Sequence, residues 1–108
     1  MRSVKESAER NRPEFISIRP CGPALFELVP KRDIRIDLEE AAQVLVQEGF
    51  EIMDSSKLIL SIRKSHEVNL YPHGRMLVYP ANTGEEAERI GTEILTILEN
   101  ARRVTNHS

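Results

Sequence analysis

The chain has 108 residues, of which 40% are hydrophobic and 30% charged, with a net charge of −2 at pH 7. This length suits one domain that buries its own core, and the slight acidity argues against non-specific binding of nucleic acid. The single cysteine, Cys21, excludes an intrachain disulfide, and no apolar run approaches the roughly 20 residues of a membrane span. We therefore expect a cytoplasmic protein with no membrane contact.

The first residues predict a flexible arm followed by two short strands. Residues 1–13 are polar and contain no apolar stripe, which is typical of a loose terminus. Glu14 to Ile18 and Ala24 to Val29 have the composition of strands. Between them, Arg19-Pro20-Cys21-Gly22-Pro23 should interrupt regular structure, because two prolines and a glycine crowd five positions.

The next segment predicts a helix and then a strand. Asp37 is a good N-cap residue, and Glu40 three positions later completes the spacing of a capping box. Apolar residues follow at helical spacing until Gly49, which we expect to end the helix. Phe50 to Met53 then has the pattern of a strand that leaves this cap.

Lys57 to Pro80 has the pattern of three antiparallel strands joined by tight turns at Lys64-Ser65 and Pro72-His73-Gly74-Arg75. Side chains two apart in a strand share a face. One face is wholly apolar, and we call it the apolar face: Leu58, Leu60, Ile62, Val68, Leu70, Met76 and Val78. The opposite face, which we call the mixed face, carries Ile59, Ser61, Arg63, Glu67, Asn69, Tyr71, Arg75, Leu77 and Tyr79.

The last segment predicts a long helix that covers the apolar face. Thr83 and Glu86 again have capping-box spacing, and the apolar residues after them fall along one helical face. Acidic residues gather near the start of this helix and Arg102-Arg103 near its end, as the helix dipole favours. Residues 14–103 should therefore form a single α+β domain, and residues 104–108 a tail.

The apolar residues of the mixed face require an explanation. A solvated sheet face usually carries threonine, lysine and glutamate, whereas Tyr71, Leu77 and Tyr79 together indicate that something covers this face. Three interpretations remain open: a surface for self-association, a specific ligand surface, and apolar residues scattered over an ordinary surface.

Part of the sequence resembles the TATA-box-binding protein fold. The stretch Asn69-Leu70-Tyr71-Pro72-His73-Gly74-Arg75-Met76-Leu77-Val78-Tyr79 is similar to a strand, a glycine-basic turn and the next strand of that family. Gly84-Glu85-Glu86-Ala87 resembles the acidic helix start that follows there. The amino-terminal domain of type III ribonuclease H is similar over the same stretch. The resemblance, over residues 34–102, implies a curved antiparallel sheet backed on one face by two helices, as in one half of that fold.

The resemblance also implies a nucleic-acid-facing side for the mixed face, at Ile59, Asn69, Tyr71, Leu77 and Tyr79. The chain departs from the family pattern in three respects, the first of which is the negative charge that Glu67 adds to this face. The family inserts pairs of phenylalanines between base steps, whereas only Tyr71 stands at such a position here. The promoter-bending member has two repeats in one chain, so that only a homodimer of this chain would rebuild its saddle.

Few residues indicate catalysis. Cys21 lies between proline and glycine near Arg19, where a thiol would be reactive. We favour the alternative interpretation, in which Cys21 is a small buried apolar residue of a rigid loop. His66, His73 and His107 show no metal-ligand spacing, and the five glycines form no phosphate loop. We therefore expect no metal, no cofactor and no catalytic site, which favours a protein that is not an enzyme.

Three functional hypotheses follow. The leading one is a small non-catalytic binding or assembly module that acts through the mixed face, as a homodimer formed there or by pairing of sheet edges. The second is nucleic-acid binding by the same face, with Tyr71 and Tyr79 stacking on bases and four basic residues contacting phosphates: Lys57, Arg63, Lys64 and Arg75. The third is an enzyme or carrier that uses the Cys21 thiol. Another protein is a further candidate partner.

Overall fold

The computed structural model describes the backbone of residues 15–107. Side chains are described throughout this range except at Ile16, Ser17, Arg19, Cys21 and residues 102–107. The flexible arm expected over residues 1–13 lies outside the described residues.

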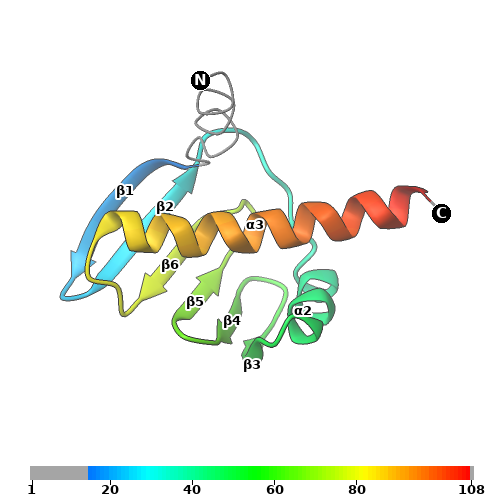
Figure 1. Cartoon of the computed structure of the whole chain (residues 1–108), viewed down its shortest axis with the longest axis horizontal. Helices are drawn as coiled ribbons and strands as arrows, with labels where there is room; N and C mark the ends of the chain where they lie inside the picture. The colour runs from blue at the N-terminus through cyan, green and yellow to red at the C-terminus, as the bar shows by residue number, and fades with distance from the viewer. Residues whose placement is uncertain (1–14, 108) are drawn as a thin grey trace, which may run out of the picture.

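Within residues 15–107, the chain forms an α+β domain in which two helices pack on one face of a six-stranded antiparallel sheet (Figure 1), as the sequence predicted. The elements are β1 (Phe15–Gly22), β2 (Leu25–Pro30), α2 (Leu38–Gln47), β3 (Glu51–Ser55), β4 (Leu60–Arg63), β5 (Glu67–Leu70), β6 (Met76–Tyr79) and α3 (Gly84–His107). The strand order is β1-β2-β6-β5-β4-β3. No helix within residues 15–107 combines the length and apolarity needed to cross a membrane.

The first strand is longer than the sequence predicted. We expected a break at residues 19–23, but β1 continues to Gly22 and Pro20 pairs with Phe26 of β2. An edge strand tolerates proline, because one of its sides has no neighbouring strand to receive an N–H. The irregularity takes the form of a register shift between Pro20 and Gly22. The chain then turns through positive φ angles at Gly22 (144°) and Ala24 (64°).

Both predicted helix starts are confirmed. The Asp37 side chain accepts hydrogen bonds from the backbone N–H groups of Glu39 and Glu40 at 3.0 and 3.2 Å. Thr83 Oγ1 accepts from the N–H of Glu86 at 3.1 Å. The end of α3 differs from the expectation, because the helix runs to His107 through the residues predicted as a tail. No proline or glycine follows Gly91, so the local sequence contains no strong helix breaker.

The apolar face forms the core beneath the helices. Six of its seven predicted members are at most 1% exposed: Leu60, Ile62, Val68, Leu70, Met76 and Val78. Leu58 is the exception, with 77% of its surface exposed. It lies in the β3–β4 turn, where Ser56 Oγ accepts hydrogen bonds from the N–H groups of Leu58 and Ile59. Because β4 begins only at Leu60, the strand alternation does not reach Leu58.

A glycine lets α3 approach the sheet closely. A Cβ atom at Gly91 would lie 2.6 Å from Leu28 Cδ1 and 2.9 Å from the ring of Phe15. Such distances are well inside van der Waals contact, so any larger residue would force the helix or its neighbours to move. The spacing between α3 and the β1–β2 hairpin therefore depends on this position.

Candidate functional site

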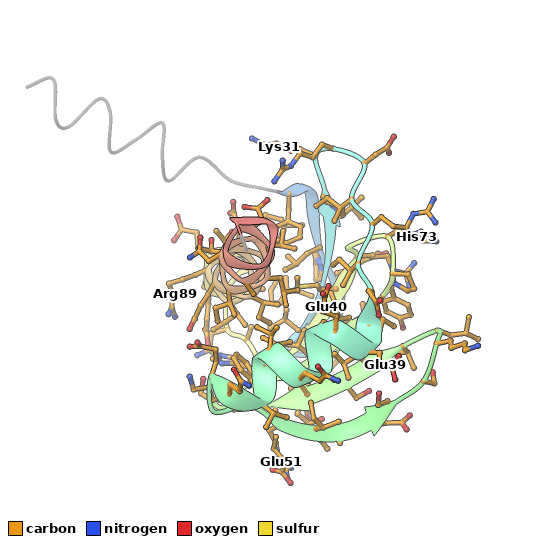
Figure 2. The ribbon with its side chains drawn as sticks, turned by 90° about the vertical axis from the view of Figure 1, so that its right-hand side faces the viewer. Lys31, Glu39, Glu40, Glu51, His73 and Arg89 are labelled. Carbon is orange, nitrogen blue, oxygen red and sulfur yellow. The ribbon has the colours of Figure 1, made fainter. Side chains whose placement is uncertain are left out.

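Backbone pairing arranges the mixed face in rows that cross the sheet. The central row consists of Glu27, Leu77, Asn69, Ser61 and Asp54. The neighbouring row consists of Tyr79, Glu67, Arg63 and Glu51. Both helices lie on the other side of the sheet, and Figure 2 shows Glu51 pointing away from α2. Neither described helix therefore covers the mixed face.

Ion pairs hold the two arginines of this face whose side chains are described. Arg63 lies 3.1 Å from Glu51 and 3.9 Å from Glu67. Arg75 lies 3.4 Å from Glu27. Four carboxylates, at Glu27, Glu51, Asp54 and Glu67, thus share the described face with two arginines. A nucleic acid would have to displace carboxylates from these arginines before its phosphates gained the same contacts.

The apolar residues of the mixed face lie among these charges. Tyr79 is 46% exposed, and Leu77 and Tyr71 are half-buried. The Arg75 guanidinium lies 4.7 Å from the centre of the Tyr71 ring, which is a cation–π contact. In the central row, Ser61 Oγ donates a hydrogen bond of 2.7 Å to Asn69 Oδ1. The face therefore mixes partly exposed apolar surface with paired charges.

The structure places the predicted site residues in different surroundings. Asn69 and Leu77 are partners in the central row, and half-buried Ile59 follows the β3–β4 turn. Lys57 is exposed in that turn. Lys64, which the sequence predicted as a phosphate contact, lies beside the end of α2. Its ammonium donates to the backbone oxygen of Glu48 at 3.1 Å, because the C-terminus of a helix attracts a cation.

The reactivity of the Cys21 thiol remains a prediction. The backbone of Cys21 belongs to β1, and its side chain lies outside the described side chains.

Sequence spacing missed a cluster of polar side chains between the β4–β5 turn and α3. His66 Nε2 lies 2.6 Å from Glu86 Oε2, and Ser65 Oγ lies 2.9 Å from His66 Nδ1. The other Glu86 oxygen accepts from the N–H of Asn82 at 3.0 Å. The hydrogen bond from His66, and then that from Asn82, lowers the pKa of Glu86 below its ordinary value. No spacing rule connects a turn with a helix start far along the chain.

This cluster contains the residue types of a hydrolytic triad, but its surroundings favour a structural role. Catalysis of that kind needs a substrate cavity with donors for the developing oxyanion. Ser65 is exposed in a turn, and the groove described below is lined by none of the three residues. Glu86 is also occupied by its bond to Asn82 at the start of α3. We interpret the cluster as a structural contact between the sheet and α3, and we call the hydrogen-bonded residues Ser65, His66, Asn82 and Glu86 the clasp.

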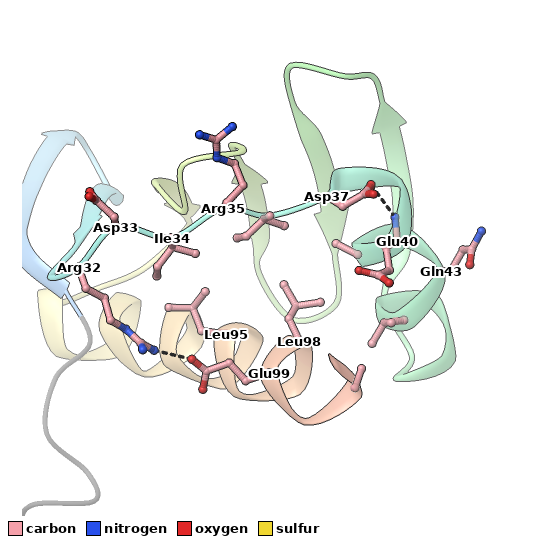
Figure 3. A pocket seen from close by; sticks show the side chains of 14 residues that line it. Arg32, Asp33, Ile34, Arg35, Asp37, Glu40, Gln43, Leu95, Leu98 and Glu99 are labelled. Carbon is pink, nitrogen blue, oxygen red and sulfur yellow. Dashed lines mark hydrogen bonds and ion pairs between the residues drawn. The ribbon is translucent and has the colours of Figure 1, made fainter. Parts of the chain in front are cut away.

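A groove of about 630 Å³ lies on the helical side of the molecule, which the sequence also did not indicate. Residues 32–37 form one side, α3 the other, and α2 closes one end (Figure 3). Its apolar lining includes Ile34, Ile36, Val44, Leu95 and Leu98. An ion pair between Arg32 and Glu99 connects the two sides. These residues come from three separate segments, so only the folded chain brings them together.

No group of three or more histidine, cysteine, aspartate or glutamate side chains suited to a metal ion occurs among the described residues. Comparisons of the chain with protein-family models, with curated proteins and with solved structures gave no match. We therefore infer function from the geometry of the described residues.

Proposed function

We propose that this protein is a small non-catalytic assembly module that forms a homodimer through its mixed face. The observation that carries the proposal is the pairing of Arg63 and Arg75 with carboxylates of the same face, at 3.1 to 3.9 Å. A face on which both signs of charge alternate is complementary to a copy of itself related by a two-fold axis. A strand of nucleic acid has only one sign of charge.

The apolar residues supply the other part of such an interface. Leu77 and Tyr71 are half-buried and Tyr79 is 46% exposed, so each has surface left to lose to a partner. Interfaces between proteins are enriched in tyrosine and arginine, with apolar contacts at the centre and polar groups around them. The half-repeat resemblance to the TATA-box-binding protein fold also supports this face as the working surface, and we retain it as part of the proposal.

The experiment compares molar mass with and without a new charge on the mixed face. Tyr79→Glu adds a carboxylate beside Glu67, its cross-strand partner, and should weaken dimerisation at least tenfold. Static light scattering over a range of concentrations should then show a lower mean mass than the wild type. Gln47→Glu, on exposed α2 surface, is the matched control and should leave the mass unchanged.

Two outcomes would overturn the proposal. One is an equal mass for the wild type and Tyr79→Glu at every concentration. The other is retardation of oligonucleotides by the wild type at low salt that weakens steeply with added salt, because released counterions produce that dependence. The latter result would favour nucleic-acid binding, with Tyr71 and Tyr79 stacking on bases and Arg75 contacting phosphate.

A further inference from the structure

The groove on the helical side is held open by contacts behind its wall. Residues 32–37 form this wall, and the backbone N–H of Ile36 donates to the Pro72 oxygen at 2.8 Å. A Cβ atom at Gly74 would lie 3.3 Å from Ile34 Cβ, so the β5–β6 turn lies directly against the wall. These contacts fix the wall to the sheet and keep it from collapsing onto α3. The chain's own packing therefore forms the groove.

The interior of the groove is apolar. Figure 3 shows Ile34 pointing toward α3, and Leu95 and Leu98 pointing from α3 toward the wall. Its volume of about 630 Å³ falls in the range of small-molecule sites, which combine an apolar lining with a few polar groups. Three lining residues are half-buried and retain surface that a ligand would cover: Ile34, Ile36 and Val44.

Most charged side chains of the lining are either occupied or directed out of the groove. Arg32 and Glu99 form an ion pair that connects the two sides at one end. The Asp37 carboxylate accepts hydrogen bonds from the first turn of α2. Figure 3 shows Asp33 and Arg35 pointing away from α3. None of these five residues therefore offers a free charge to the interior.

Glu40 differs from the other charged residues of the lining. It lies at the α2 end, and its carboxylate points into the groove in Figure 3. No ion pair between Glu40 and a basic side chain occurs among the described side chains. A free carboxylate at one end of an apolar channel attracts a cation and repels an anion.

We propose that the groove binds a small amphipathic amine, whose apolar body lies between α3 and residues 32–37 and whose ammonium group lies at Glu40. The ion pair between Arg32 and Glu99 fits this polarity, because it neutralises the end of the groove that the apolar body reaches. The inference goes beyond the proposed function, since the groove and the mixed face lie on opposite sides of the sheet. The two surfaces therefore do not compete.

The test compares probes that share one alkyl chain and differ in the charge of the head group: octylamine, octanol and octanoate. At neutral pH the amine is a cation and the carboxylate an anion. The full chain should bind octylamine saturably and about threefold more tightly than octanol, as an exposed ion pair predicts, and octanoate should bind most weakly. Methyl NMR spectra should show the octylamine-induced shifts at Ile34, Leu95 and Leu98.

Two matched pairs of variants on α2 test the head-group and apolar parts of the site. Glu40→Gln should weaken octylamine about threefold and leave octanol unchanged, whereas Glu39→Gln, in the same turn but outside the lining, should change neither. Val44→Phe should fill the groove and abolish binding of every probe. Val46→Phe, 51% exposed and outside the lining, should leave binding intact. Circular dichroism verifies that each variant is folded.

The inference is overturned if octylamine does not bind saturably, if octanol binds as tightly, or if Glu40→Gln and Glu39→Gln weaken octylamine equally. Octylamine binding that survives Val44→Phe overturns it as well, because the amine then binds elsewhere. Tyr79→Glu separates the groove from the proposed function. This variant should bind octylamine as the wild type does, whatever its molar mass shows about the mixed face, and a loss of binding would overturn an independent site in the groove.

Discussion

The two faces of strands β4 to β6 are built from alternating residues of the same segments, yet different interactions hold them. On the apolar face, Ile62 is 0% exposed beneath the helices. On the mixed face, its neighbour Arg63 is exposed and contacts carboxylates at 3.1 and 3.9 Å. Burial of aliphatic groups contributes far more to folding than exposed ion pairs do.

The difference between the two faces suggests that one determines the stability of the domain and the other its contacts with partners. The apolar face fixes the fold, since its side chains have no room to change. The exposed ion pairs of the mixed face should contribute little to folding, so we expect the domain to tolerate their substitution. Substitutions on the first face should therefore unfold the protein, and those on the second should change its assembly.

The largest expected effect tests the apolar face directly. Ile62→Ala should lower the free energy of unfolding by about 3 kcal/mol, because it removes buried methyl groups and leaves a cavity. Ser61→Ala, one residue away on the mixed face, should cost only about 1 kcal/mol through loss of its hydrogen bond to Asn69. Urea denaturation followed by circular dichroism measures both. Equal losses would contradict the comparison of the two faces.

The packing of α3 on the apolar side gives the next effect. Gly91→Val should destabilise the protein by about 2 kcal/mol, since its side chain would meet Leu28 and Phe15 at positions now within 2.9 Å. Thermal denaturation measures the loss, with Thr96→Val on the exposed side of the same helix as control. An unchanged melting temperature for Gly91→Val would show that α3 shifts away from the sheet without cost.

The clasp between the sheet and α3 predicts a smaller, pH-dependent effect. The pKa of Glu86 is lowered in the folded protein from its ordinary 4.5, so the ionised carboxylate stabilises the fold above that pH. This stabilisation is lost as the pH falls through the lowered folded-state value. The difference in free energy of unfolding between wild type and Glu86→Gln should therefore be largest at neutral pH and shrink in acid.

Denaturant titrations at neutral pH and at about pH 3 measure this difference. Glu85→Gln, in the same first turn of α3, serves as control because none of the contacts of the clasp involves Glu85. A Glu86→Gln difference that is independent of pH would remove the carboxylate from the clasp.

The smallest effect on stability belongs to the mixed face. Arg63→Ala should change the free energy of unfolding by less than about 1 kcal/mol, since both of its ion pairs are exposed to solvent. The same substitution should raise the dissociation constant of the proposed mixed-face dimer, which sedimentation measures. A large loss of stability with no effect on assembly would reverse the roles assigned to the two faces.

Local patterns predicted the features that depend on neighbouring residues. The cap at Asp37 was predictable because a carboxylate two or three positions before free N–H groups accepts their hydrogen bonds. Leu58 shows the limit of such reasoning. The alternating pattern of the sequence includes Leu58, but the backbone turns there, and its side chain is exposed. Pro20 shows another limit, because its acceptance in β1 depends on the position of that strand at the sheet edge.

The amino-acid sequence by itself determined the helix starts and the division of the central strands into an apolar and a mixed face, because short-range hydrogen bonding and side-chain alternation act within a few residues. Only the tertiary structure decided that Arg63 and Arg75 meet carboxylates, that His66 reaches Glu86, and that residues 32–37 form a groove with α3. Those contacts join segments distant along the chain, and their distances are set by how the helices pack on the sheet.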